Sequence, residues 1–536
     1  MIRACLQSCL LGLAFWLCLT DVHAALNIGI GVNFTGSTYG VNSAAQPSDA
    51  AGAAGLQHFV EFINGSFSVY DKTTGTQVLT MTDTEFWASN GVQFAPGFDS
   101  SNPRIIFDKA SGRWFAAQID ATANADTTNR FLLAVSITAD PTSGWKAVAF
   151  PSDISGTNFA DFPTLGVNAV GVYLGAVLYP TNATATNSVG MTLVSIPKSD
   201  LLAPVPTVAN RSSFGVLKEA NYGYILQPVV AQDSGDTNEI VLAVAHSGDD
   251  LLPHFTLRAA TIRDAAGPTP ATLTAPTSIP VAAYSIPLNP FQPDGLDDLD
   301  DGDSRFSASV YQVGDIIYAV HSDELASGTA VHWYRLNALD YSVVQSGTVS
   351  DTNLDFFYPC IAANTNGVVV IGFNGSSTNT FVSCYAVAGE TINGKLTFGS
   401  PILLKAGVAN YTFPDPATGT TAWGDYSAIT VDPIDSSRFW TIQTYASGNN
   451  EWSTHVSELK VTSSVNAVLS LSRNGTDAIV SWPTAAPNFH LEFADALTST
   501  NTPWIAASQT TLTNGGLISV TMPVANGQRF FRLQGP

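Results

Sequence analysis

Asp161-Phe-Pro-Thr-Leu-Gly-Val-Asn-Ala-Val-Gly-Val-Tyr-Leu-Gly175 has the same pattern as Tyr358-Pro-Cys-Ile-Ala-Ala-Asn-Thr-Asn-Gly-Val-Val-Val-Ile-Gly372. In both stretches a proline precedes an apolar strand, an asparagine-containing turn follows, and a second apolar strand is bounded by glycines. Gln227-Pro-Val-Val-Ala, which leads into Ile240–Ala245, is a third copy. Because one hairpin recurs along the chain, the sequence predicts an array of repeated β-units.

A second repeated pattern supports the first. Ile105–Phe115 and Ile429–Trp440 each contain a strand, a turn that begins with aspartate, and then an arginine followed by aromatic residues. Aspartate favours such turns because its carboxylate accepts backbone N–H bonds two residues on. The aromatic side chains are suited to filling the space between packed sheets. Further copies occur at Phe59–Tyr70 and Arg305–Val320.

Counting these copies gives seven units, which start near residues 55, 103, 161, 226, 304, 358 and 424. Their spacing of roughly 50–80 residues suits four-stranded blades with some long loops. Long helical periodicity is nearly absent. We therefore predict an all-β chain whose residues 25–462 form a β-propeller of seven blades. A set of separate β-sandwiches is the alternative, and the repeat is too short to favour it.

The end of the chain, residues 463–536, has a different pattern. Asn474-Gly475 and Asn514-Gly515-Gly516 mark turns between short predicted strands. These strands are Val468–Leu471, Ala478–Trp482, His490–Phe493, Leu517–Met522 and Arg529–Leu533. The pattern predicts a small β-sandwich of the fibronectin or immunoglobulin type.

The first 24 residues have the features of a secretory signal peptide. Arg3 is followed by the apolar run Leu10–Leu19, and Val22-His23-Ala24 places small residues at the cleavage positions. No second long apolar stretch follows, so we expect a protein secreted to the periplasm or the cell exterior without a transmembrane segment. Cys360 and Cys384 remain after cleavage, and two outcomes stay open: one disulfide or two buried thiols.

The chain is acidic without being highly charged. Its formal net charge is −22, yet only 12% of its residues are charged and 45% are hydrophobic. This composition is globular. The negative charge argues against nucleic acid and anionic membranes as partners and favours cations or neutral ligands. We expect a monomer that binds a small molecule or a glycan.

Several motifs, in the same order, resemble a family of secreted bacterial β-propeller proteins, most of them uncharacterised. They are Asn64–Gly75, Pro103-Arg104 with Phe107–Phe115, Ala134–Pro141 and Trp423-Gly-Asp-Tyr-Ser427. The tail, with Val480-Ser-Trp482 and Gln528–Arg532, is similar to C-terminal sandwich modules of secreted proteins. The resemblance implies the fold and an extracellular location, and it implies little about activity.

One acidic run is the strongest candidate for a cation site. Six carboxylates lie within Asp294-Gly-Leu-Asp-Asp-Leu-Asp-Asp-Gly-Asp303, at Asp294, Asp297, Asp298, Asp300, Asp301 and Asp303. Carboxylate oxygens are ligands that Ca²⁺ prefers, and the two glycines permit tight wrapping. The spacing does not match an EF-hand. Calcium binding and a solvated acidic loop are both open interpretations.

A second candidate site comes from aligning the starts of the blades. Asp161, Asp303 and Asp425 each precede the first strand of a blade, and that strand lines the central channel of a propeller. We therefore expect these carboxylates to converge at one mouth of the channel, as catalytic groups. The ligand-binding residues would be Arg104, Arg305, Trp423 and Tyr426. The alternative is that each aspartate caps its own turn and pairs with an arginine.

The usual enzyme signatures are missing. The sequence has no Gly-x-Ser-x-Gly elbow, no His-Glu-x-x-His helix and no phosphate loop, and we expect no organic cofactor. His321 and His332 flank one hairpin, where structural histidines are more common than metal ligands. Three hypotheses follow: an extracellular binding protein for a glycan or surface partner, a calcium-dependent hydrolase of the lactonase, esterase or glycosidase type, and a structural matrix protein.

Overall fold

The computed structural model describes residues 26–536 except for short gaps, so the predicted signal peptide lies outside the described residues. The gaps are 124–125, 182–186, 232–234, 236, 246–251, 294, 296–298, 415–420, 464–468, 476, 484–488, 496–502, 515–516, 524–528 and 535–536. Two compact units are present, one spanning Leu26–Thr462 and the other containing Ser463–Pro536. No described helix is long and apolar enough to cross a membrane.

The larger unit is a β-propeller, and the described residues make seven blades. The first three blades are β2 (Ala51–Ala54), β3 (His58–Ile63), β4 (Ser66–Asp71) and β5 (Gln77–Met81); β6 (Phe98–Asp108), β7 (Arg113–Thr122), β8 (Arg130–Ser136) and β9 (Trp145–Pro151); and β10 (Asn158–Val167), β11 (Gly171–Pro180), β12 (Gly190–Pro197) and β13 (Ser212–Ser213).

The next three blades follow the same antiparallel order. They are β14 (Tyr224–Ala231), β15 (Glu239–Val244), β16 (His254–Arg263), β17 (Thr272–Leu273) and β18 (Thr277–Tyr284); β19 (Val310–Val313), β20 (Ile316–Leu325), β21 (Gly328–Asn337) and β22 (Val343–Val349); and β23 (Asp355–Ala363), β24 (Val368–Ser377), β25 (Thr380–Ile392), β26 (Lys395–Phe398) and β27 (Ile402–Lys405).

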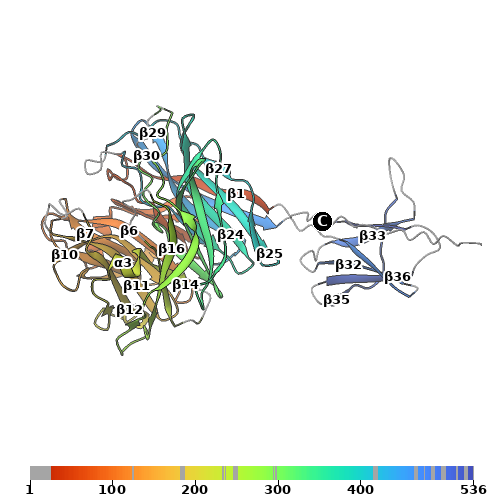
Figure 1. The fold of residues 1–536 in the computed structure, drawn as a ribbon, viewed down its shortest axis with the longest axis horizontal. Coiled ribbons are helices and arrows are strands. Elements are labelled where there is room, and N and C mark those ends of the chain that lie inside the picture. Colours follow the sequence, from red (N-terminus) through yellow and green to blue (C-terminus); the bar gives the residue numbers. More distant parts are fainter. Residues whose placement is uncertain are drawn as a thin grey trace, which may run out of the picture. The chain divides into compact units, whose positions relative to one another are not determined.

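The seventh blade joins the two ends of the unit. It contains β28 (Ala428–Val431), β29 (Arg438–Gly448) and β30 (Glu451–Ser463), and its outermost strand is β1 (Leu26–Thr38) from the start of the chain. Figure 1 shows the red strand β1 beside the blue strands of this blade. Each blade's first strand contacts the first strand of the next blade, and β28 contacts β2, so the seven blades close into a ring.

Apolar runs form the blades because both faces of each sheet are covered. All eight residues of β12 and of β14 are buried, and the buried side chains of β11 and β24 pack against neighbouring sheets. The few helices are short: α1 (Asp83–Ser89), α2 (Lys198–Leu201) and α3 (Glu219–Tyr222). The fold class that the sequence predicts is therefore confirmed, and each predicted unit start lies within a few residues of a first strand.

The smaller unit is a two-sheet β-sandwich. One sheet is β31 (Ser470–Asn474), β32 (Asp477–Pro483), β36 (Leu517–Pro523) and β35 (Leu512–Asn514); the other is β34 (Ile505–Ala506), β33 (His490–Ala494) and β37 (Phe530–Gln534). Val480, Trp482, Leu491, Val520 and Met522 form its core. All five strands predicted from the sequence overlap observed strands.

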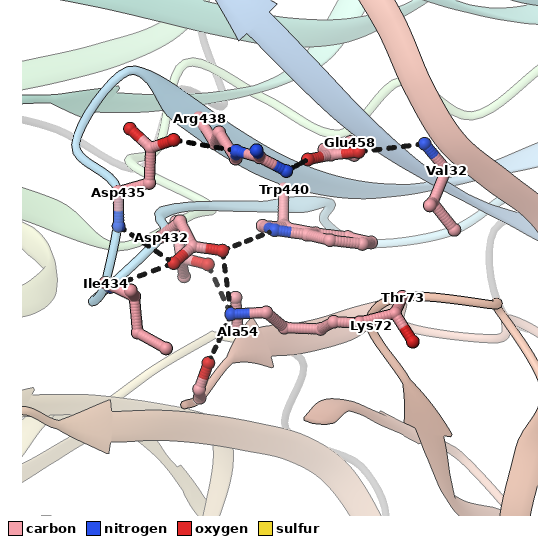
Figure 2. A network of polar contacts seen from close by, with 12 residues as sticks. Val32, Ala54, Lys72, Thr73, Asp432, Ile434, Asp435, Arg438, Trp440 and Glu458 are labelled. Carbon is pink, nitrogen blue, oxygen red and sulfur yellow. Dashed lines mark hydrogen bonds and ion pairs between the residues drawn. The ribbon is translucent and has the colours of Figure 1, made fainter. Parts of the chain in front are cut away.

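The turns that begin with aspartate also connect neighbouring blades. Asp432 follows the first strand of the seventh blade, and its carboxylate accepts the backbone N–H groups of Ile434 and Asp435, as the sequence motif predicts. The same carboxylate accepts the indole N–H of Trp440 and pairs with Lys72 of the first blade, as Figure 2 shows. This buried contact lies between the first and last blades.

The structure shows that Cys360 and Cys384 do not form a disulfide, which the sequence left open. Both lie in the sixth blade, on β23 and β25, and both are buried free thiols. Their closest acceptors are backbone carbonyl oxygens, those of Gly372 and Thr444 respectively. Burial raises the pKa of the Cys360 thiol to about 11, so it stays protonated at neutral pH.

Candidate functional site

A β-bulge at the same place in several first strands shapes one mouth of the channel, which we call the upper mouth. Asn102, Phe162, Ile225 and Tyr358 have positive φ angles of 58°, 51°, 53° and 46°, and each lies at a register shift between the first and second strands of its blade. A bulge bends the strand and re-aims its side chains. Asp49, just before β2, has the same backbone conformation, with φ at 51°.

The register between blades shows which residues are equivalent. Val167, Val230 and Tyr311 align across the parallel contacts of β10, β14 and β19. Counting back six residues from each places Asp161 and Arg305 at equivalent positions. Asp303 therefore lies two residues earlier, which corrects the sequence-based alignment that put the aspartates at one position.

Fewer than half of the seven predicted mouth residues come together in one cavity. A cavity of about 210 Å³ at the upper mouth contains three of them, Asp303, Arg305 and Asp425. Its remaining lining residues are Asp301, Gly302, Ser307, Ser322 and Tyr358. Asp161 does not line this cavity, but its charge interacts with the Arg305 guanidinium. The cavity has room for a small polar group.

Asp303 and Arg305 form an ion pair that lines the cavity. Arg305 donates from Nε to Oδ1 and from Nη2 to Oδ2 of Asp303, both at 2.8 Å. Such two-point pairs fix both side chains. Burial would lower the pKa of the Arg305 guanidinium, but Asp303 and neighbouring anionic groups raise it well above its usual value. Arg305 also lies over the Phe162 ring, 4.6 Å from its centroid.

Arg104 lies inside the channel, below the mouth, and is 6% exposed. Its Nε donates to the Pro163 carbonyl oxygen and its Nη1 to that of Ser307, both at 2.8 Å, so one side chain connects three blades. The guanidinium stacks 3.5 Å from the centroid of the Tyr426 ring. Both residues thus close the channel rather than line the cavity, and Arg104 Nη2 has no hydrogen-bond partner among the described residues.

Asp49 belongs to this mouth, and the sequence analysis missed it. Its Oδ2 accepts from Asn64 Nδ2 at 2.9 Å and its Oδ1 from the backbone N–H of Asp425 at 3.3 Å. Burial raises the pKa of the Asp49 carboxyl to about 6. Burial and the neighbouring Asp49 charge raise the pKa of Asp425 well above its usual range. The signal was present: Asp49 precedes the first strand of its blade as Asp425 does, but the first unit was counted from residue 55, after that strand.

Two further polar atoms at the mouth lack partners. Tyr358 OH and Asp301 Oδ1 are buried, line the same cavity and have no hydrogen-bond partner within the described residues. Burial raises the pKa of the Tyr358 hydroxyl well above its usual value, so it remains a donor. Buried polar groups in folded proteins are nearly always paired, and an unpaired donor and an unpaired acceptor that line one cavity are typical of a place where a ligand or ordered water binds.

Trp423 lies elsewhere. Its side chain is buried, its indole N–H donates to Asn374 Oδ1 at 3.1 Å, and its ring packs edge-on against Tyr411. It is part of an aromatic cluster of the core and does not line the mouth cavity. Its role in the structure is therefore packing, in contrast to the ligand contact that the sequence suggested.

The acidic run is only partly described. Asp294, Asp297 and Asp298 lie outside the described residues. Asp300 accepts the backbone N–H of Gly302 at 2.8 Å, which tightens the turn before the mouth. Across the described part of the chain, no three His, Cys, Asp or Glu side chains form a group that could hold a metal ion.

His321 and His332 are directly opposite each other on β20 and β21, with their rings stacked 5.5 Å apart. His332 Nδ1 contacts Asp323 Oδ2 at 2.9 Å, and His321 Nε2 contacts Tyr334 OH at 3.0 Å. Burial lowers the pKa of the His321 imidazole to about 4. These contacts fit the structural role that the sequence favoured.

A larger cavity lies at the other end of the first strands, which we call the lower mouth. It is open to solvent and has an empty volume of about 760 Å³, and its walls include Ala53, Ile106, Phe107, Val230 and Val431. Asn364 and Asp432, at its rim, already bind backbone or side-chain partners in the next blade. The larger cavity and the carboxyl groups with raised pKa values therefore lie at opposite ends of the channel.

Comparisons with known proteins give structural likeness alone. No protein-family model and no curated protein matches the chain. A protein of unknown function from Dyadobacter fermentans is 11% identical, with a TM-score of 0.38, and the match covers 69% of this chain and 97% of that one. An exo-β-1,3-galactanase from Phanerochaete chrysosporium is 11% identical over 78% of this chain and 95% of that chain, with a TM-score of 0.29.

A sialidase mutant of Trypanosoma rangeli that displays trans-sialidase activity is 10% identical, with a TM-score of 0.34 over 81% of both chains. These likenesses are too weak to carry an argument about the ligand or chemistry of this chain. The family resemblance that the motifs suggest stays a prediction.

Proposed function

We propose that this chain is a secreted, monomeric binding protein whose upper mouth binds a hydroxyl group of a glycan or of a similar polyhydroxylated ligand. The observation that carries the proposal is the pair of unpartnered buried atoms in one cavity, the Tyr358 hydroxyl and Asp301 Oδ1. A sugar hydroxyl is both donor and acceptor, so it satisfies two such atoms at once.

The charges at the mouth favour a neutral ligand. The charge of the Arg305 guanidinium is already compensated by the Asp303 carboxylate, which accepts two of its five N–H groups. The net charge of −22 would also repel an anion. Hydroxyl groups, by contrast, donate readily to carboxylates.

Glycan-array screening of the mature protein, followed by calorimetric titration of the best sugar, tests the proposal. Tyr358→Phe removes the unpartnered hydroxyl, so it should keep or raise thermal stability and weaken sugar binding up to about tenfold. Asp425→Asn should weaken it by about tenfold or more. Tyr311→Phe is the matched control: its hydroxyl donates to the Ile429 carbonyl oxygen inside the channel, and its loss should leave binding unchanged.

Wild-type affinity in both mouth variants would overturn the proposal. A protein that binds no sugar on the array would also overturn it, and would favour a structural matrix role.

A second candidate function, hydrolysis of a glycosidic, lactone or ester bond, rests on the Asp49–Asp425 pair. Two interacting carboxyl groups with raised pKa values retain a proton near neutral pH, which is what a general acid requires. Turnover of the bound sugar's glycosides, lost in Asp425→Asn with binding retained, would favour this candidate over binding alone.

A further inference from the structure

One segment contributes residues to the upper mouth and is attached to carboxylates of the fifth blade. This segment, which we call the strap, runs from Ser285 to Asp303 between β18 and β19, and residues 294 and 296–298 within it are undescribed. The backbone N–H of Ser285 donates to Asp323 Oδ1 at 2.8 Å, and that of Leu288 donates to Glu324 Oε2 at 3.0 Å. The end of the strap supplies three cavity residues, among them Asp301.

Oxygen atoms gather around one hydroxyl group beneath the strap. Thr329 Oγ1 lies 3.0 Å from the Leu288 carbonyl oxygen, 3.4 Å from Glu324 Oε2 and 3.5 Å from Asp301 Oδ2. A hydroxyl has one proton to donate, so it can satisfy only one of these three acceptors. Asp355 Oδ1 accepts the backbone N–H of Thr329 at 3.1 Å and brings a further carboxylate near.

These carboxylates have no cationic side chain beside them. Among the described residues no lysine, arginine or histidine forms an ion pair with Asp301, Glu324 or Asp355. Asp301 is 1% exposed and its Oδ1 has no hydrogen-bond partner in the described structure. A buried carboxylate without a partner is costly unless it is protonated or a cation lies beside it.

We propose that a divalent cation of the calcium type binds between Asp301 Oδ2 and Glu324 Oε2, with the Leu288 carbonyl oxygen as a further ligand, and joins the described ends of the strap to the fifth blade. Calcium accepts irregular sets of six to eight oxygens, including backbone carbonyls and water, whereas magnesium requires a near-ideal octahedron. A site with two carboxylates and neutral oxygens is compatible with the lack of a three-carboxylate group in the described residues. The inference goes beyond sugar binding and holds for a protein that binds no sugar.

The experiment is calorimetric titration of the EDTA-treated mature protein with CaCl₂, together with thermal melts in EDTA and in CaCl₂. Wild type should bind calcium and melt at a higher temperature when calcium is present, because the cation binds the native state. MgCl₂ should produce a smaller rise in melting temperature. Glu324→Gln should lose at least about tenfold in calcium affinity and most of the calcium-dependent rise.

The same variant distinguishes a cation site from a mere pair of repelling carboxyl groups. In EDTA, Glu324→Gln should melt at or above the wild-type temperature, because one of two neighbouring charges is gone. Asp315→Asn, at the exposed turn between β19 and β20, is the charge-matched control and should keep the full calcium response. Absence of calcium binding, or an unchanged response in both Glu324→Gln and Asp301→Asn, overturns the inference. Sugar titrations in EDTA test the proposed function separately, because they measure sugar binding when no calcium is present.

Discussion

The ammonium group of Lys72 in the first blade lies 2.7 Å from Asp432 Oδ2 in the seventh, and both side chains are buried. The second and third blades repeat this relationship, with Lys198 Nζ 2.7 Å from Asp108 Oδ2. In each pair the aspartate lies at or just after the end of a first strand, and the lysine follows the third strand of the next blade. These clasps join neighbouring blades at the lower mouth, and the Lys72 clasp also closes the ring (Figure 2).

Lys72→Met should lower the free energy of unfolding by about 3 kcal/mol or more, because it leaves the Asp432 carboxylate buried without its partner. Urea unfolding followed by tryptophan fluorescence measures the change. Lys198→Met should have an effect of similar size. Lys395→Met, at an exposed position on β26, is the control and should stay within about 0.5 kcal/mol of wild type. Equal stability of all three variants would show that the clasps contribute nothing.

Glu61 attaches the first strand of the chain to the ring. Its carboxylate accepts from the Ser37 backbone N–H at 3.1 Å, the Ser37 hydroxyl at 3.0 Å, the Tyr70 hydroxyl at 2.7 Å and the Thr454 hydroxyl. Glu61→Ala should cost about 3 kcal/mol or more, because four donors lose a charged acceptor. Hydrogen exchange should speed up first in β1. Glu451→Ala, an exposed position on β30, should leave exchange in β1 unchanged.

The raised pKa of the Asp49 carboxyl predicts that the free energy of unfolding depends on pH. Its pKa is raised from 3.8 to about 6 in the folded state, so its protonated form is favoured and its contribution to stability decreases as pH rises from about 4 to about 6. The unfolding free energy of wild type minus that of Asp49→Asn should therefore fall across this window by up to about 3 kcal/mol. Urea titrations at pH 4, 5, 6 and 7 measure it. A difference that is flat with pH would contradict the prediction.

The lowered pKa of the His455 imidazole predicts the opposite dependence of stability on pH. Burial and the nearby Lys405 charge lower the pKa of its imidazole to about 4, so stability is retained above pH 6.5 and is lost as pH falls towards 4. Neither ring nitrogen has a hydrogen-bond partner among the described residues. His455→Leu should be near wild type at pH 7.5 and more stable than wild type by up to about 3 kcal/mol at pH 4. Parallel acid unfolding curves for the two proteins would refute this.

Much of the fold could be predicted from local patterns. Hairpins such as Asp161–Gly175 recur because each blade packs between two other blades in the same way. Each blade therefore needs similar apolar strands and similar turn residues. Asp108 and Asp432 were recognisable as turn residues because their carboxylates bind the backbone two or three residues further on. The strands of the sandwich were visible for the same reason, as short apolar segments between Asn-Gly turns.

The site was only partly predictable, because it is made by side chains from different blades. The position of Asp161 and Asp425 in the repeat correctly predicted that they lie near one mouth. It did not predict that Arg104 fills the channel whereas Arg305 lines the cavity. Trp423 follows the same alignment, yet its side chain packs into the core. Asp49 was missed because the strand after it, β2, is only four residues long.

By itself, the sequence determined that the chain is all-β, repeated seven times and followed by a sandwich, because strand periodicity and turn chemistry act over a few residues. Only the tertiary structure decided which groups meet. The pairing of Lys72 with Asp432, the contact of Asp49 with Asp425, and the oxygens around Thr329 all join residues from different blades or from the strap. Closure of the ring places them together. The burial that follows raises the pKa values of Asp49 and Asp425 and leaves Asp301 Oδ1 without a hydrogen-bond partner in the described part of the chain.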